Sequence, residues 1–368
     1  MRRLTIIAKP TLLCNCACRY CITPKNIPKN KITREDIELL CQKISCSTIY
    51  DYFTFIWHGG EPLLMGVDFY KDIFSIQEKT IGRDRFRNTF QTNCTLINDE
   101  WMDFFIENRL MVSASLDGDR ESHDVNRIKN NQGTFDDVFR IIKQLQSARL
   151  LTGVVTVLSK SNISKVEKFL EFFASNNISP RLNPILPSER VLSNESDLSI
   201  SAMEYADCLI KCYDNWVSGK YNDSNGKPLR IAPLTDIIHN FYRPERPRPC
   251  VFSTSCSDNF LSINPVGDLF NCGRFCDIAE YKIANIHDDF DNIDSILELK
   301  RKTTQWNLPV PADDECLNCE WLSVCNRGCP NSSFIFSGNI MSKDPFCEGY
   351  KKVFAHIYNH LKSKLNNE

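Results

Sequence analysis

Four cysteines lie within eight residues near the start of the sequence, in TLLCNCACRYCITP. Cys14, Cys18 and Cys21 have the spacing C-x3-C-x2-C, and Cys16 lies inside this loop. Three thiolates on one tight loop suit a cubane [4Fe-4S] cluster and leave its fourth iron open to another ligand, so we expect chemistry at that iron. Alternation along the chain would direct Cys16 away from the others, and we interpret it as a spare. A zinc site that uses Cys16 is the alternative.

A second group of cysteines lies in the last third of the chain. Its spacings include C-x10-G-x4-C and C-x2-C-x5-C-x3-C, and its eight members suffice for two clusters with four thiolates each. These candidates are Cys250, Cys256, Cys272, Cys316, Cys319, Cys325, Cys329 and Cys347. Zinc is the structural alternative, because C-x2-C knuckles often bind it. Cys276 competes with Cys272, whereas we interpret Cys41, Cys46, Cys208 and Cys212 as packing residues of helices.

Composition restricts the setting of this chemistry. The 44 basic and 46 acidic residues give a formal net charge of -2, so we expect no nucleic-acid partner. The apolar run Leu4–Ala8 is too short for an export signal, and no run approaches the roughly 20 apolar residues of a membrane span. We therefore expect a cytoplasmic protein without a membrane partner, in which clustered cysteines are metal ligands rather than disulfides.

Short apolar runs alternate with amphipathic stretches in the first half of the chain. This pattern predicts an α/β fold, a partial (β/α)6 barrel of the TIM type with its functional groups at the carboxyl ends of the strands. The expected strands are residues 4–10, 53–60, 88–93, 110–118, 151–159 and 180–186. The expected helices are residues 33–44, 97–108, 134–146 and 162–175.

The 368 residues exceed the size at which one core stops growing, so we expect more than one domain. We place the barrel in residues 1–218 and a polar, proline-rich linker in residues 219–249. Residues 250–368 would form a small loop-rich iron–sulfur domain that ends in a C-terminal helix. We expect no separate leader-peptide-binding domain before the first strand.

The cysteine loop and the following HGGEPL motif, His58–Leu63, together resemble the radical S-adenosylmethionine (radical SAM) enzymes over residues 4–186. The resemblance implies that S-adenosylmethionine chelates the open iron and is cleaved by an electron from the cluster to a 5′-deoxyadenosyl radical. Gly59 and Gly60 would let the backbone approach this ligand, and Glu61 could accept a hydrogen bond from its ammonium group.

The same resemblance implies further cofactor contacts. Tyr20 stands where members place an aromatic residue near the adenine, and Ser115 and Arg127 match positions that contact ribose and carboxylate. The other matched positions are Gln91, Asn93 and Leu186. Cys94 replaces the glycine of the usual Q-T-N-G, and Leu186 has an equally good interpretation as a core residue.

The distal cysteines resemble the SPASM extension of radical SAM peptide maturases. By this resemblance, auxiliary cluster I would bind to Cys250, Cys256, Cys272 and Cys329. Auxiliary cluster II would bind to Cys316, Cys319, Cys325 and Cys347. The protein would then hold three [4Fe-4S] clusters and S-adenosylmethionine, with an external electron donor such as flavodoxin or ferredoxin.

Two substrates remain open. Anaerobic sulfatase-maturating enzymes, which form formylglycine, have an aspartate base directly after the cysteine that follows the glycine, but this chain has Gly273 there and Asp277 four residues later. The stretch 272–286 is more similar to maturases that crosslink ribosomally made peptides, including the cyclophane-forming group. We expect oxidative crosslinking of a precursor peptide, with formylglycine formation on a client protein as the alternative. A non-enzymatic, metal-stapled interaction module is the third possibility.

Overall fold

The structure, a computed structural model, describes residues 2–23, 29–187, 191, 198–243, 250–253, 256–276, 278–303 and 314–365. In these residues the main sheet has nine strands in the order β11-β10-β9-β1-β2-β3-β4-β7-β8. The strands are β1 (Arg3–Ala8), β2 (Tyr52–Trp57), β3 (Phe86–Thr92), β4 (Met111–Ser115), β7 (Leu151–Leu158), β8 (Pro180–Pro184), β9 (Phe260–Ile263), β10 (Asp268–Phe270) and β11 (Lys282–Asn285). A separate hairpin contains β5 (Ile128–Lys129) and β6 (Gln132–Gly133).

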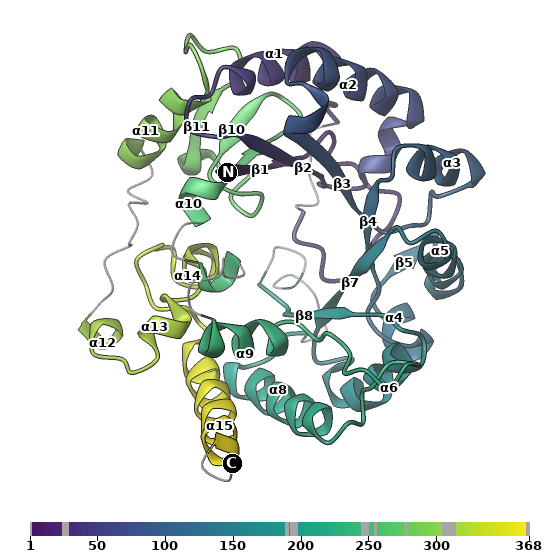
Figure 1. Ribbon diagram of the computed structural model, residues 1–368, viewed down its shortest axis with the longest axis vertical. Helices are drawn as coiled ribbons and strands as arrows, with labels where there is room; N and C mark the ends of the chain where they lie inside the picture. The colour runs from purple at the N-terminus through teal and green to yellow at the C-terminus, as the bar shows by residue number, and fades with distance from the viewer. Residues whose placement is uncertain are drawn as a thin grey trace.

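The six strands expected from the sequence form the parallel part of this sheet, from β1 to β8. Figure 1 shows that this part curves into an open barrel, with α1, α2, α3, α5 and α6 on its outer side. The α/β class and the partial barrel are therefore confirmed.

The α-helices are α1 (Arg34–Ser45), α2 (Val67–Thr80), α3 (Asp99–Glu107), α4 (Arg120–Asp124), α5 (Phe135–Ser147), α6 (Val166–Ser175), α8 (Ala202–Val217), α9 (Leu234–Tyr242), α10 (Cys256–Asn259), α11 (Ile293–Thr303), α12 (Asp314–Leu317), α13 (Leu322–Cys325), α14 (Pro330–Ser337) and α15 (Cys347–Leu365). The four expected helices correspond to α1, α3, α5 and α6. Helix α2 was not expected, although Val67, Tyr70, Ile73 and Phe74 give it a buried face at helical spacing.

Local sequence explains where these elements begin and which face they bury. Helix α1 starts after Thr33, whose hydroxyl accepts a hydrogen bond from the Asp36 N–H at 3.0 Å, while the Asp36 carboxylate accepts from the Thr33 N–H at 2.9 Å. Alternate residues of β2, Phe53, Phe55 and Trp57, are fully buried. Burial of each such side chain contributes about 1.5–3 kcal/mol to folding.

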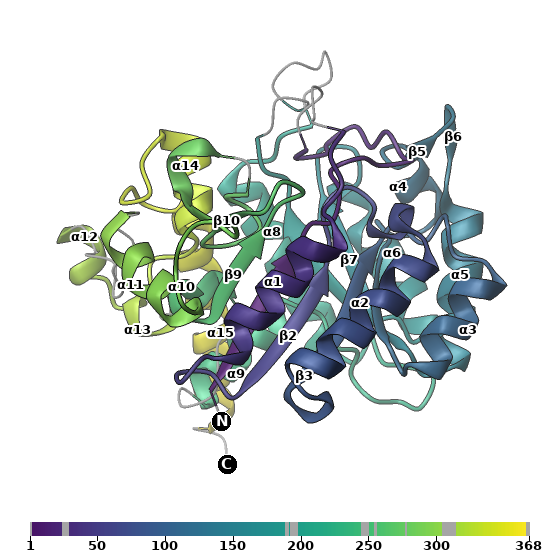
Figure 2. The same ribbon diagram turned by 90° about the horizontal axis from the view of Figure 1, so that it is seen from above.

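The cysteine-rich segment extends the sheet of the barrel. Strand β9 pairs in parallel with β1, and β10 and β11 continue the sheet with antiparallel pairing. Figure 2 shows the segments of this part, α10 to α14, gathered beside β9 and β10 at one edge of the barrel. Helix α15 packs along α8. The centre of the Tyr205 ring in α8 lies 5.5 Å from that of Phe346, directly before α15, and 6.2 Å from that of Tyr350 in α15.

Helix α9 lies within the expected linker, residues 219–249, and residues 244–249 are outside the described ranges. The domain boundaries stay predictions. None of the described helices combines the length and the apolar character needed to cross a membrane.

Candidate functional site

The loop that carries the first cysteines follows β1 and is held by backbone hydrogen bonds. The Ala17 N–H donates to the Ile128 carbonyl at 2.7 Å, and the Arg19 N–H donates to the Asn126 carbonyl at 3.0 Å. These bonds attach the loop to the segment that follows β4. The position of Cys18 between Ala17 and Arg19 is thereby fixed relative to the barrel.

Cys14, Cys18 and Cys21 interact electrostatically. Burial, together with the charges of Cys21 and Cys14, raises the pKa of the Cys18 thiol to about 11. Coordination to iron would favour the thiolate despite this pKa, because a metal binds the deprotonated form.

The expectation that Cys16 points away from these thiols is wrong. The Cys16 N–H donates to the sulfur of Cys14 at 3.4 Å, and a hydrogen bond between the two thiols raises the pKa of Cys14 and lowers that of Cys16. The chain bends at Asn15, so the alternation of an extended strand does not apply.

The two glycines of the HGGEPL motif let this segment lie against the cysteine loop. The Gly60 N–H donates to the Thr11 carbonyl at 3.0 Å, and the Glu61 N–H donates to the Leu13 carbonyl at 2.8 Å. A Cβ atom on Gly59, whose φ is +116°, would lie 2.6 Å from the Thr11 oxygen, and one on Gly60 would lie 2.1 Å from the Leu13 oxygen. Only glycine fits at these contacts, and the two motifs are thus brought together.

The Glu61 side chain is 1% exposed and links the ends of β2 and β3. Its Oε1 accepts hydrogen bonds from the Leu63 N–H at 3.1 Å and the Thr92 hydroxyl at 2.8 Å, and its Oε2 accepts from the Asn93 N–H at 2.8 Å. Burial raises the pKa of Glu61 to about 7. Three donors of the protein thus already surround the carboxylate. Its contact with the ammonium group of S-adenosylmethionine stays a prediction.

The expected cofactor residues of β3 and β4 contact one another and the cysteine loop. The Gln91 amide donates to the Ser115 hydroxyl at 3.1 Å. The Asn93 amide donates to the Asn15 side-chain oxygen at 2.9 Å and lies 3.6 Å from the sulfur of Cys14. The end of β3 therefore contacts the loop through Asn93, and its Gln91 contacts Ser115 at the end of β4.

Cys94 has a backbone conformation that glycine adopts without strain. Its φ is +64°, in the left-handed region, and its side chain is fully buried. The Cys94 N–H donates to the Thr92 hydroxyl at 3.0 Å, which helps to hold this strained conformation.

Tyr20 and Arg127 meet at a buried aspartate that the sequence analysis did not single out. Arg127 donates to Asp117 through Nε at 2.9 Å and through Nη2 at 3.0 Å, and the Tyr20 hydroxyl donates to the same carboxylate. Asp117 lies two residues after Ser115, just beyond the end of β4, so its place after a strand was a signal that could have singled it out. Leu186 follows β8 and its side chain joins the core. The contacts of Tyr20, Arg127 and Leu186 with the cofactor stay predictions.

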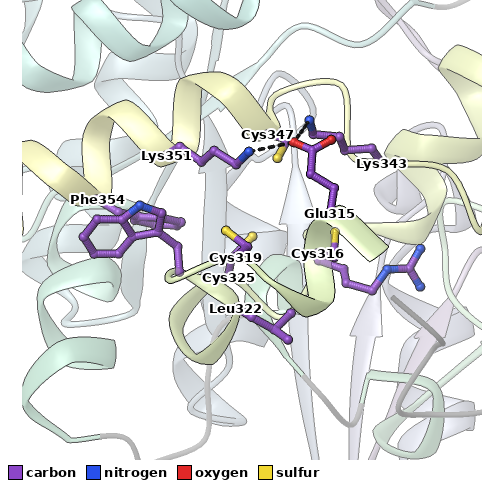
Figure 3. Close-up of a pocket in the computed structure, with 11 residues that line it drawn as sticks. Glu315, Cys316, Cys319, Leu322, Cys325, Lys343, Cys347, Lys351 and Phe354 are labelled. Atoms are coloured by element: carbon purple, nitrogen blue, oxygen red, sulfur yellow. Dashed lines mark hydrogen bonds and ion pairs between the residues drawn. The ribbon is translucent and has the colours of Figure 1, made fainter. Parts of the chain in front are cut away.

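One pocket brings together the four cysteines assigned to auxiliary cluster II. They come from α12, the turn after it, α13 and the start of α15, and Figure 3 shows their sulfur atoms around one space with Glu315, Lys343 and Lys351 beside it. The four are Cys316, Cys319, Cys325 and Cys347. Burial raises the pKa of the Cys347 thiol to about 11.

The cysteines assigned to auxiliary cluster I also gather in space. Cys256 and Cys272 pack against the same small apolar cluster, which includes Phe275. Burial, followed by the charges of Cys329 and Cys250, raises the pKa of the Cys272 thiol to about 11. Ligation by both sets stays a prediction. No group of three or more Cys, His, Asp or Glu side chains in the described ranges is placed to hold a single metal ion.

Position 273, where the sulfatase maturases would have their base, lies against β1. A Cβ atom on Gly273 would be 2.8 Å from the Ile7 Cγ2 atom, so a carboxylate side chain fits only if Ile7 moves. Asp277, the candidate catalytic base, lies outside the described residues.

Five cysteines besides Cys16 and Cys94 were not assigned as ligands. Cys41, Cys208, Cys212 and Cys276 are buried, in agreement with a packing role for the first three. Cys46 is exposed, so its interpretation as a packing residue is wrong. It follows the last residue of α1, where the chain turns toward solvent.

Comparison with known proteins agrees with this geometry. Residues 9–173 match the family model described as the radical SAM superfamily. The chain is 27% identical to the serine-type anaerobic sulfatase-maturating enzyme of Bacteroides thetaiotaomicron, over 99% of this chain and 92% of that protein. It is also 27% identical to the cysteine-type anaerobic sulfatase-maturating enzyme of Clostridium novyi, over 96% of this chain and 95% of that protein.

Two solved structures share the fold. Native anSMEcpe with bound AdoMet aligns with a TM-score of 0.85 and 21% identity over 99% of both chains. SuiB of Streptococcus suis bound to S-adenosylmethionine aligns with a TM-score of 0.62 and 14% identity, over 94% of this chain and 76% of that one. Residues 9–173, which hold the cysteine loop and the HGGEPL motif, are a radical SAM domain, and enzymes with this domain use S-adenosylmethionine and a [4Fe-4S] cluster.

Proposed function

We propose that this enzyme oxidises a side chain of a ribosomally made peptide by two electrons and joins it to a neighbouring aromatic ring. Eight further cysteines gather in two sets beside the radical SAM domain. This observation carries the peptide-modifying part of the proposal. The sulfatase-maturating relatives, which match nearly the whole chain, support a peptide or protein substrate. SuiB, which shares the fold, has been solved with its precursor peptide SuiA.

The first cysteine loop fits a cluster with an open iron. Cys14, Cys18 and Cys21 would hold it, and the bound cluster with S-adenosylmethionine supplies the radical that removes a hydrogen atom from the substrate. Gly59 and Gly60 set the backbone of the HGGEPL motif against this loop. Side chains at and near the carboxyl-terminal ends of the strands orient the cofactor. These proposed contacts are Tyr20, Glu61, Gln91, Asn93, Ser115, Arg127 and the backbone of Leu186.

The electron count requires a second acceptor. One electron and one proton leave the substrate together as the hydrogen atom, and crosslinking then releases a second electron and a second proton. We assign the second electron to oxidised auxiliary clusters bound by the two distal cysteine sets. An external carrier of the flavodoxin or ferredoxin type supplies the electron that starts each turnover.

Gly273 supports crosslinking over formylglycine formation. The sulfatase-maturating family uses a carboxylate at this position as a base, and a side chain here would meet Ile7 at 2.8 Å. The curated relatives favour formylglycine formation, which is the second candidate, with Asp277 as a relocated base.

Product analysis separates the two candidates. The anaerobically reconstituted enzyme is incubated with S-adenosylmethionine, a strong reductant, and either a precursor peptide encoded beside its gene or a sulfatase-type peptide. Crosslinking gives a product lighter by two hydrogens whose fragmentation is blocked between the joined residues. Because oxidation of serine also removes two hydrogens, capture by a hydrazide probe provides the decisive distinction. An aldehyde formed by the wild-type enzyme and lost in Asp277→Asn would contradict crosslinking.

A further inference from the structure

Arg274 lies in the turn that carries Cys272, and its side chain reaches Cys329, which is assigned to the same cysteine set. Its Nη1 atom lies 3.8 Å from the sulfur of Cys329, in hydrogen-bonding geometry. Its charge also interacts with those of Cys250 and Cys272. The exposed guanidinium group of Arg274 therefore lies beside one thiol assigned to auxiliary cluster I and acts electrostatically on two others.

The backbone around Arg274 fixes this position. Its carbonyl oxygen accepts a hydrogen bond from the Asn331 amide at 3.2 Å, which ties the turn to α14. Gly273 lies against Ile7 of β1 on the other side. The backbone of the turn that carries Arg274 is held between the barrel and the helix that begins directly after Cys329.

The charge of Arg274 also changes the pKa of two other side chains, Asp344 and His58. Arg274 lowers the pKa of the buried Asp344, although burial raises that pKa overall. After burial and Lys9, it also helps to lower the pKa of His58 to about 4. Because His58 opens the HGGEPL motif, the charge of Arg274 acts between the auxiliary cysteines and the radical SAM site.

A fixed cation beside an iron–sulfur cluster favours its reduced form. A [4Fe-4S] cluster with four thiolate ligands becomes more negative when it accepts an electron, and hydrogen bonds to its sulfurs raise its potential. Arginine stays charged at every physiological pH, so this effect does not depend on protonation.

We propose that Arg274 is a positioning residue that raises the reduction potential of auxiliary cluster I and so makes this cluster the acceptor of the second substrate electron. This inference rests on the proposed function, because it requires a cluster bound by Cys250, Cys256, Cys272 and Cys329. A cluster held by these cysteines would accept the one electron that the substrate gives up as the new bond forms and a proton leaves, and the external carrier would take up that electron.

The test is a redox titration of the full chain, followed by electron paramagnetic resonance. Arg274→Gln and Arg274→Lys are compared with wild type and with Arg120→Gln, which removes an exposed arginine paired with Asp136. The titrations use the Cys14→Ala, Cys18→Ala, Cys21→Ala background, so that only auxiliary signals remain. We expect one auxiliary potential to become more negative in Arg274→Gln, to stay near wild type in Arg274→Lys, and to be unchanged in Arg120→Gln.

Several outcomes would overturn this role. Unchanged potentials with full iron content exclude tuning. If Arg274→Gln made in the otherwise wild-type chain then raises the KM for the peptide, Arg274 instead binds an acidic group of the substrate. Loss of iron from Arg274→Gln would show that the arginine holds the cluster rather than tunes it. If the parent background binds only about four irons per chain, one auxiliary cluster is absent. The proposed ligand sets are then wrong, and with them the proposed role of Arg274.

Discussion

The buried carboxylate of Asp344 accepts a hydrogen bond from the backbone N–H of Cys329 at 2.8 Å. Its other oxygen accepts from the Phe346 N–H at 2.8 Å, and its carbonyl oxygen accepts from the Cys347 N–H at 2.9 Å. Cys329 and Cys347 belong to different cysteine sets. Asp344 therefore connects the segments that carry the two proposed auxiliary clusters.

Asp344→Ala should destabilise both cysteine sets. The change leaves two buried N–H groups without acceptors, and each such loss costs about 1–3 kcal/mol. We expect a lower Tm and less iron per chain than in Asp207→Ala, which removes an exposed carboxylate paired with Lys352. Equal iron content in the two variants would show that Asp344 does not support the clusters.

Gly60→Ala should displace the first cysteine loop. The new methyl group would lie 2.1 Å from the Leu13 carbonyl oxygen and 2.4 Å from that of Leu12, and backbone atoms cannot move aside cheaply. We expect loss of the first cluster with both auxiliary clusters retained, measured by iron content and by 5′-deoxyadenosine formation. Gly226→Ala is the control, because no atom lies within 4 Å of the added carbon, although its positive φ of +74° adds a backbone strain that Gly60 does not have. Wild-type activity of Gly60→Ala would contradict this packing argument.

His123 should make the protein less stable in acid. Burial lowers its pKa to about 3, and its Nδ1 accepts a hydrogen bond from the Asp117 N–H at 3.2 Å, which only an unprotonated nitrogen can do. The unfolded chain takes up a proton near pH 6.5 while the folded protein does not, so stability falls as the pH drops from about 6.5 toward 3.

Urea unfolding of wild type and His123→Gln at pH 7.5 and 4.5 measures this contribution. Wild type should lose about 2–3 kcal/mol more on acidification than the variant. Parallel losses in the two proteins would mean that His123 is not kept neutral in the folded state.

Replacement of single cysteines should distinguish ligands from spares. Cys319→Ala and Cys347→Ala should lose iron and solubility, because cluster binding is coupled to folding of the segment that they hold together. Cys16→Ser should keep about twelve irons per chain, the content of three cubane clusters. If Cys16→Ser loses one whole cluster, Cys16 is itself a cluster ligand and the assignment of Cys14, Cys18 and Cys21 is wrong.

The sequence predicted those features that are local. Phe53, Phe55 and Trp57 alternate along one strand, and Thr33 caps a helix whose apolar spacing is visible in the sequence. The pairing of β9 with β1 was not predictable in this way, because strands more than 200 residues apart leave no local pattern. Helix α2 has a regular apolar face and could have been found.

The candidate site shows the same division. The cysteine spacing and HGGEPL indicated the chemistry, but the partners of their side chains depend on the meeting of separate strand ends. Glu61 reaches donors on β3 and its following turn, and Arg127 reaches Asp117 ten residues earlier. The bend at Asn15 likewise reversed the direction expected for Cys16, since alternation is a property of extended chain alone.

The most direct test of the central claim is 5′-deoxyadenosine formation by the anaerobically reconstituted protein with S-adenosylmethionine and a strong reductant. The radical SAM assignment predicts that wild type forms 5′-deoxyadenosine, and that replacement of Cys14, Cys18 and Cys21 together by Ala abolishes it while about eight irons per chain remain. Continued formation of 5′-deoxyadenosine by the triple variant, or none by a wild-type protein that holds all of its iron, would contradict the account.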